Sequence, residues 1–124
     1  MIMNILSRGV ILAIPLVLIG ALNARAEGNT PRETLGNATT HTVEIKGFKY
    51  SPEILTLTVG DTVRWVNLDA APHTATAGNE NWDSGKLKRG EEWSFTTTET
   101  GKTQYICTYH PVMKGLLIVK ERGQ

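Results

Sequence analysis

The residues best suited to chemistry in this 124-residue chain lie in one short segment near the C-terminus. Cys107, His110 and Met113 follow a C-x2-H-x2-M pattern between two stretches with strand-like composition. A thiolate, an imidazole and a thioether are donors that suit copper cycling between Cu(I) and Cu(II), with the methionine as a weak, long axial ligand. The segment therefore predicts a site for one copper ion, and that site needs a second imidazole.

Two further histidines are available to supply that imidazole. His41 opens the first expected strand, whereas His73 follows Pro72 in the loop directly after the strand that ends at Asn67. In a β-sandwich the loops gather at the two ends, so the loop after a central strand can meet the loop before the last strand. We therefore expect His73 to be the second nitrogen ligand.

Three other readings of these residues stay open on the sequence alone. A lone buried cysteine is often an inert core residue. A structural zinc site would use the same cysteine and histidines, although zinc does not seek a thioether such as Met113. A cysteine hydrolase would pair Cys107 with His110, but no orienting Asp or Asn and no glycine-rich oxyanion loop accompany that pair.

The elements that must position these residues read as strands. Short runs rich in Val, Ile, Thr, Trp and Tyr alternate with Gly, Pro and Asp, and no segment has the period of an amphipathic helix. We expect strands at 42–48, 54–59, 62–67, 91–97, 103–107 and 115–120. Gly60-Asp61 predicts a hairpin between the second and third of them. Several short antiparallel strands indicate an all-β fold, a Greek-key β-sandwich.

The N-terminus has the pattern of a secretory signal. Arg8 precedes the apolar run Gly9–Leu22, and Ala24-Arg25-Ala26 fits a small-x-small cleavage site. Fourteen apolar residues are fewer than the roughly 20 of a spanning helix. We expect a signal peptide at 1–26 that is cleaved after Ala26, a polar, flexible leader at 27–40 and one domain at 41–124. The product would be periplasmic, without a membrane anchor.

Charge and cysteine content narrow the function further. Removal of Arg8 and Arg25 with the signal takes the 13 basic residues to 11, against 12 acidic residues, a formal charge of −1. The two signs are interspersed, so we expect no strong electrostatic preference and no nucleic-acid partner. The single cysteine, Cys107, cannot form an internal disulfide, and this leaves a thiol that metal binding explains.

Several segments together resemble the cupredoxins, the type 1 (blue) copper proteins of amicyanin and plastocyanin type. The resemblance covers residues 42–120 and rests on GDTVRWVN at 60–67, Pro72-His73, DSG at 83–85, Gly90-Glu91 and the stretch from Tyr105 to Gly115. The short C-x2-H-x2-M spacing of Cys107, His110 and Met113 is most similar to the amicyanin type. One position departs, because amicyanin-like loops usually carry proline where this chain has Tyr109.

The resemblance implies a two-sheet Greek-key sandwich and copper bound by His73, Cys107, His110 and Met113. It also implies that Asn67 bonds near Thr108 and pins the cysteine loop. A further implication is that the amide of Thr74 donates to the Cys107 sulfur. Such outer bonds tune metal affinity and reduction potential.

We therefore expect a soluble, monomeric one-electron carrier rather than an enzyme. Its transient redox partner proteins would be a donor dehydrogenase and an acceptor cytochrome or oxidase. They would dock on a small apolar face formed by Ala71, Pro72, Tyr109, Pro111 and Val112. The alternative is copper delivery by the same site; a catalytic copper enzyme would need more ligands than the one spare histidine, His41.

Overall fold

The computed structural model describes residues 36–123, and its regular elements are eight strands. The expected signal peptide and leader residues 27–35 lie outside the described residues. No helix in the described part is long and apolar enough to span a membrane. The strands are β1 (Thr40–Ile45), β2 (Tyr50–Ser51), β3 (Ile54–Thr58), β4 (Thr62–Asn67), β5 (Thr76–Ala77), β6 (Glu92–Thr96), β7 (Gly101–Ile106) and β8 (Lys114–Lys120).

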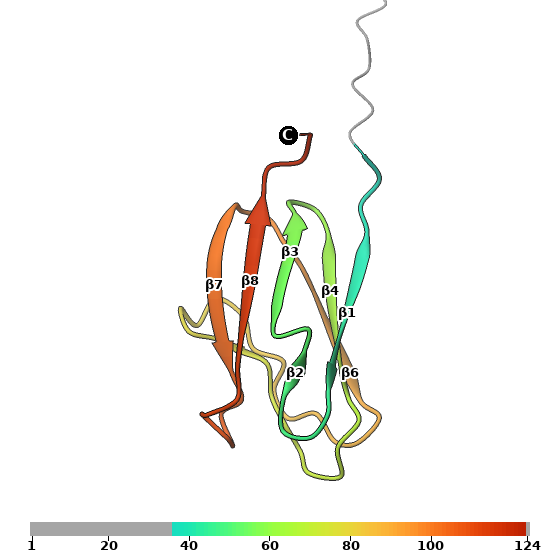
Figure 1. The fold of residues 1–124 in the computed structure, drawn as a ribbon, viewed down its shortest axis with the longest axis vertical. Coiled ribbons are helices and arrows are strands. Elements are labelled where there is room, and N and C mark those ends of the chain that lie inside the picture. The colour runs from blue at the N-terminus through green and yellow to red at the C-terminus, as the bar shows by residue number, and fades with distance from the viewer. Residues whose placement is uncertain (1–35, 124) are drawn as a thin grey trace, which may run out of the picture. The chain divides into compact units, whose positions relative to one another are not determined.

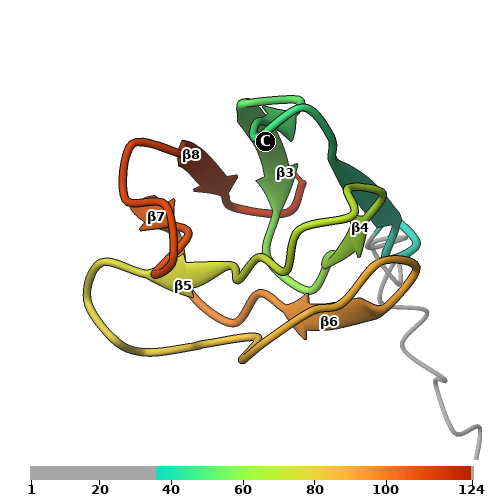
Figure 2. The same cartoon turned by 90° about the horizontal axis from the view of Figure 1, so that it is seen from below.

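These strands form two four-stranded sheets that face each other, with the orders β2-β1-β4-β6 and β3-β8-β7-β5 (Figures 1 and 2). The predicted all-β sandwich is confirmed. Two pairings, β1 with β4 and β3 with β8, are parallel, whereas the sequence analysis expected antiparallel strands throughout. The loops after β1, β4 and β7 lie together at the lower end of Figure 1.

The predicted hairpin between β3 and β4 is wrong. The chain does turn at Gly60-Asp61, where Gly60 has a φ of 89° and Asp61 N donates to Thr58 O at 3.0 Å. This turn carries the chain from one sheet to the other, so β3 pairs with β8 while β4 pairs with β1 and β6. Alternation of apolar residues fixes the inward face of a strand but does not identify its hydrogen-bonding partner.

The core between the sheets is built by alternate residues of the central strands and by aromatic rings. Val63 and Trp65 of β4 are fully buried, as are Val43 and Ile45 of the neighbouring β1. The Trp65 ring packs against three other aromatic rings, with centroids 5.1–5.6 Å apart: those of Trp82, Trp93 and Tyr105. Tyr105 lies two residues before Cys107, so this packing extends to the strand that leads into the candidate site.

Tyr105 and Gly115 set the spacing of the two strands that flank the cysteine loop. The two residues are cross-strand partners in β7 and β8, and the buried tyrosine ring lies over the glycine. A Cβ at position 115 would lie 2.1 Å from Cζ of Tyr105, a distance that no side chain allows. Glycine is therefore required here for close approach.

Asp61 stabilises the end of the sandwich opposite the loops after β1, β4 and β7. Its carboxylate, whose side chain is 6% exposed, accepts hydrogen bonds from the amides of Thr39 (2.9 Å) and Thr58 (3.1 Å). His41 Nε2 lies 3.0 Å from the same carboxylate, and the guanidinium of Arg122 pairs with it. One side chain thus joins the start of β1, the end of β3 and the C-terminal segment.

Substitution of Asp61 by Asn should lower the free energy of unfolding by about 2–3 kcal/mol at pH 7, because buried donors lose their charged acceptor. Burial alone would raise the pKa of Asp61, but the hydrogen bonds from Thr39, His41, Thr58 and Arg122 hold it well below its usual value. A lowered pKa gives stability that is complete above the unfolded-state pKa of about 3.9 and declines as the pH falls below it. The difference between wild type and variant should therefore shrink below pH ~4.

Urea unfolding of both proteins between neutral and acid pH measures this difference. Glu99→Gln is the matched control, because Glu99 is exposed near the same end and should change stability by less than about 0.5 kcal/mol. A deficit in Asp61→Asn that stays constant down to the acid limit would contradict the assigned role of the charge.

Candidate metal centre

Cys107, His110 and Met113 are spaced three residues apart because the backbone makes two successive turns between them. The amide of His110 donates to Cys107 O at 3.2 Å, and the amide of Met113 donates to His110 O at 2.9 Å. The amide of Cys107 in turn donates to Met113 O at 3.3 Å, which closes the loop onto itself. Because each turn brings every third residue to the same side, the three side chains are held close together.

His73 is held by the loop between β4 and β5. Its backbone exchanges two hydrogen bonds with Leu87, at 3.0 and 2.8 Å, in an isolated antiparallel bridge. The side-chain amide of Asn67 donates to Ala71 O and to Leu87 O, both at 2.9 Å. Asn67 therefore fixes the loop that carries His73.

The structure brings the sulfur and the two imidazoles together. Nδ1 of His73 and Nδ1 of His110 each lie 3.7 Å from Cys107 Sγ, and the three potential ligand atoms all lie within 4.8 Å of one another. Cys107 and His73 are fully buried, Met113 is 3% exposed, and His110 is partly exposed. His41 is bonded to Asp61 at the other end of the sandwich, as expected for the histidine that does not join the site.

Thr74 connects the two loops. Its amide points at Cys107 Sγ, 3.4 Å away, in agreement with the expected contact. Its hydroxyl accepts from the amide of Thr108 at 2.9 Å, and its carbonyl accepts from the Tyr50 hydroxyl at 2.5 Å. Burial raises the pKa of Tyr50 far above its usual value, so this hydroxyl keeps its proton and remains a donor.

The expectation that Asn67 bonds near Thr108 is not met. The side-chain NH2 of Asn67 donates to the backbone oxygens of Ala71 and Leu87, which belong to the loops that hold His73. Its side-chain oxygen accepts from the backbone amide of Asp69 at 2.9 Å. The amide of Thr108 donates to the Thr74 hydroxyl instead, and Asn67, the last residue of β4, holds the loop of His73.

Asp69 orients His73, and the sequence analysis missed it. Its carboxylate lies 2.9 Å from His73 Nε2 and also accepts from the amides of Gly47 (2.7 Å) and Phe48 (2.9 Å). Burial would raise the pKa of Asp69, but these amides and His73 hold it below its usual value. The network assigns the His73 proton to Nε2, which leaves Nδ1 free to face the sulfur. The four-residue spacing from Asp69 to His73 was the available signal.

Phe48 is the second residue that the sequence did not reveal. Its ring makes edge-to-face contacts with the rings of His73 and His110, with centroids 5.0 and 4.8 Å away. Phe48 has a φ of 57°, a conformation rare for a bulky residue, and its amide is fixed by Asp69. No local pattern announces this contact, because it depends on the loop after β1 reaching the loops after β4 and β7.

The donor set fits copper better than the other metals considered. Two imidazole nitrogens around one buried thiolate, with a buried methionine three residues beyond His110, match a copper site of mixed hard and soft ligands. His73, Cys107, His110 and Met113 are the residues that could hold the ion. The hydrolase reading lacks support, since Asp69 orients the imidazole of His73 and the described residues give His110 no carboxylate partner.

The comparisons with known proteins agree with this chemistry. A family model described as "Copper binding proteins, plastocyanin/azurin family" matches residues 37–120. Amicyanin of Paracoccus denitrificans is 36% identical over 83 residues, which cover 63% of this chain and 63% of that protein. Amicyanin of Paracoccus versutus is 30% identical over 125 residues, 91% of this chain and 95% of the relative.

Solved structures give the same relationship. A reduced tryptophan-to-tyrosine variant of amicyanin matches with a TM-score of 0.61 and 35% identity, covering 65% of this chain and 82% of that one. A copper-containing nitrite reductase from Thermus scotoductus SA-01 matches equally well, with a TM-score of 0.61 and 35% identity. That match covers 64% of this chain but only 22% of the reductase.

Replacement of Asp69 by Ala should weaken copper binding by about 10- to 100-fold, because His73 loses the acceptor that fixes its ring and its proton. Asp69→Asn should retain most of the affinity, since an amide oxygen can still accept from Nε2. Competition with a chelator, followed by mass spectrometry under native conditions, measures both affinities. Equal affinity of wild type and Asp69→Ala would contradict the orienting role.

Proposed function

Since the chain belongs to the plastocyanin/azurin family of copper-binding proteins, we propose that it is an exported type 1 copper protein that carries single electrons. Copper would be held by the imidazoles of His73 and His110, the thiolate of Cys107 and, axially, the thioether of Met113. The convergence of two Nδ1 atoms on one buried sulfur, each 3.7 Å away, is the observation that supports this assignment best.

A copper ion in such a donor set accepts and releases one electron. The task of the protein is then to hold similar ligand positions in both oxidation states, so that little rearrangement accompanies each transfer. Cys107 and His73 are fully buried, and the amide of Thr74 is available to the thiolate at 3.4 Å. Packed interiors resist displacement, so these side chains favour fast electron exchange over chemical change.

The electron would enter and leave at the partly exposed edge of His110. The expected apolar face around it includes the exposed Tyr109 and Val112, 49% and 89% exposed. Phe48, which is 50% exposed and packs edge-to-face against His110, extends this face. A small apolar contact suits the weak, short-lived encounters of redox proteins. We propose transient partners of the classes expected above, a donor dehydrogenase and an acceptor cytochrome or oxidase.

Copper delivery by the same site is the second candidate function. Delivery sites commonly offer several exposed sulfur or imidazole ligands, whereas Met113 is the only methionine among the described residues and is buried. That scarcity favours electron transfer. The two functions separate when the copper-loaded protein is mixed with an acceptor oxidase: a carrier loses electrons and keeps its metal, whereas a delivery protein loses the metal.

A catalytic copper enzyme is less well supported, although one solved relative is a nitrite reductase. A second copper would need further ligands, and in the described part of the chain His41 is engaged with Asp61 away from the first site. The chain also matches only 22% of the reductase. We therefore propose a carrier and not an enzyme.

Export remains part of the proposal and rests on the N-terminal sequence. A signal peptide at 1–26 would direct the protein to the periplasm and leave Glu27 as the first residue. Mass measurement of the protein recovered from the periplasm tests this directly, because retention of the first 26 residues would exclude cleavage after Ala26.

Addition of Cu(II) to the mature protein should produce an intense thiolate-to-copper absorption band in the visible range, because Cys107 would bind the ion as a thiolate. Cys107→Ser should lose this band, because serine offers no comparable thiolate bond, and should still fold, because the side chains are nearly equal in size. Absorption spectra with circular dichroism as the folding control measure both effects.

A colourless copper complex of the wild type would rule out the type 1 assignment. Retention of the band in Cys107→Ser would instead show that another group supplies the colour. His41→Ala serves as the control for a histidine outside the site and should keep the full band.

A further inference from the structure

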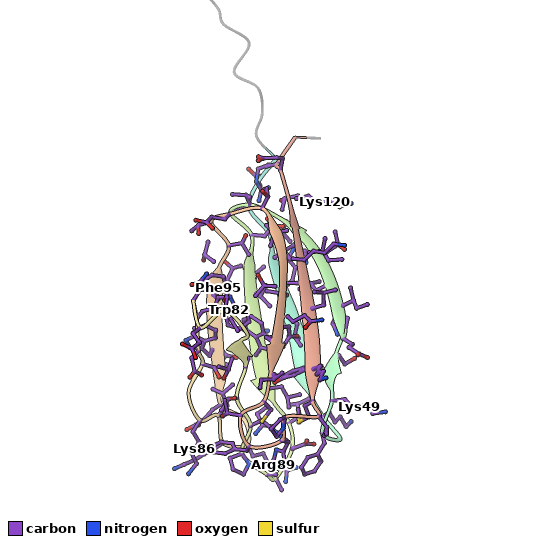
Figure 3. The ribbon with its side chains drawn as sticks, turned by 90° about the vertical axis from the view of Figure 1, so that its left-hand side faces the viewer. Lys49, Trp82, Lys86, Arg89, Phe95 and Lys120 are labelled. Carbon is purple, nitrogen blue, oxygen red and sulfur yellow. The ribbon has the colours of Figure 1, made fainter. Side chains whose placement is uncertain are left out.

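The fold gathers positive charge at the end of the molecule that carries the candidate metal centre. The segments 46–49, 68–75, 85–91 and 107–114 form the loops of this end and contain six basic residues against two carboxylates. We call the basic set the collar: Lys46, Lys49, Lys86, Lys88, Arg89 and Lys114. Figure 3 shows Lys49, Lys86 and Arg89 at this end and Lys120 at the opposite one.

This distribution differs from the even mixture that the sequence analysis expected. The opposite end, with segments 59–61, 97–100 and 120–123, carries three carboxylates and two basic side chains, Lys120 and Arg122. Residues of either sign alternate along the chain, but the turns at one end of a sandwich come from distant parts of it. The fold therefore concentrates positive charge at the end that carries the candidate metal centre, although the composition is nearly neutral.

The collar charges are exposed and not neutralised within the described residues. All six side chains are exposed, and none takes part in the ion pairs found there, which involve Arg64, Arg122 and the histidines 41 and 73. Of the two carboxylates, Asp69 is 13% exposed and committed to His73, while Glu91 accepts from the amide of Lys88 at 2.7 Å. A further acid, Glu53, lines a pocket together with Lys49 and Lys114.

The collar lies next to an apolar centre. Its residues come from the loop after β1, the loop before β6 and the start of β8, which lie on different sides of the end facing the viewer in Figure 2. The exposed side chains of Phe48 and Val112 line one pocket with Lys49 and Lys114, and the exposed Tyr109 belongs to the same loop as Val112. A nucleic-acid groove would instead need a continuous basic track along a phosphate backbone.

From this arrangement we infer that the collar selects partner proteins whose redox centre is ringed by acidic side chains. The inference rests on the proposed electron-carrier function and specifies its partner. An acidic rim would be attracted and oriented by the collar, while the apolar centre makes the short contact at His110. Charge complementarity of this kind raises association rates and excludes like-charged partners more than it raises affinity.

Electron exchange with two cytochromes of opposite surface charge tests the inference. Reduced cytochrome b5 presents an acidic haem edge and cytochrome c a basic one. Each gives one electron to the copper protein, as haem iron goes from Fe(II) to Fe(III) and copper from Cu(II) to Cu(I). Stopped-flow measurements at low and at roughly physiological ionic strength give the bimolecular rate constants, because salt screens charges beyond a Debye length of about 8–10 Å.

The rate constant with cytochrome b5 should fall by about tenfold as salt is raised, whereas that with cytochrome c should not fall. Lys86→Gln with Arg89→Gln should lower the low-salt rate with cytochrome b5 several-fold. The matched control, Lys102→Gln with Lys120→Gln, removes the same charge from strands outside the collar and should change it by less than about twofold. Both double variants should keep the absorption spectrum and the midpoint potential of the wild type.

Rates that are insensitive to salt, or that respond equally to both double variants, would overturn the inference while the blue copper protein remains a carrier. A protein that binds no copper or exchanges no electrons would overturn the proposed function and this inference with it. Collar-dependent binding to duplex DNA or anionic vesicles at about 0.15 M salt, with no preference between the cytochromes, would assign the collar to a different partner and overturn the inference.

Discussion

The Cys107 sulfur must be held, buried, between two imidazoles, one of which is 34 residues away in the sequence. Burial of a thiolate raises the free energy of the folded protein unless hydrogen-bond donors or a metal ion compensate its charge. The loops around Cys107 therefore have to hold such donors and the two imidazoles close to the sulfur. Two successive turns place His110 beside the sulfur, and the bridge between His73 and Leu87 holds the other imidazole. Thr74 joins the two loops and offers its amide to the sulfur.

The sandwich makes this arrangement stiff. Gly115 leaves room for the ring of Tyr105, which lies over it, and Trp65 packs edge-to-face against that ring from the facing sheet. These contacts anchor both ends of the cysteine loop to the core. At the far end, Asp61 holds the chain termini of the domain by ionic hydrogen bonds. The two ends are therefore held by different interactions, hydrogen-bonded turns and a backbone bridge at one and a buried carboxylate at the other.

Residue types and spacing predicted much of this structure, and topology accounts for what they left out. The ligands in the cysteine loop are local in sequence, and strand alternation predicts which residues face the core, so both were accessible. The pairing of β3 with β8, the contact of Phe48 with both imidazoles and the hydrogen bond from the Thr108 amide to the Thr74 hydroxyl all join segments far apart in the chain. Their geometry depends on how loops converge after folding, which no local pattern records. The basic collar was hidden for the same reason, because its six residues are distributed over two loops and the start of β8.

In this structure the polypeptide, rather than a metal ion, positions the side chains proposed as copper ligands. A crystal structure of the metal-free protein at high resolution, set beside one of the copper-loaded protein, is the decisive measurement. Both forms should keep His73 Nε2 hydrogen-bonded to Asp69, the Thr74 amide on the Cys107 sulfur and both Nδ1 atoms directed at that sulfur. If the 107–113 loop unfolds in the metal-free form, or if either imidazole turns away from Cys107, the metal and not the polypeptide positions these side chains.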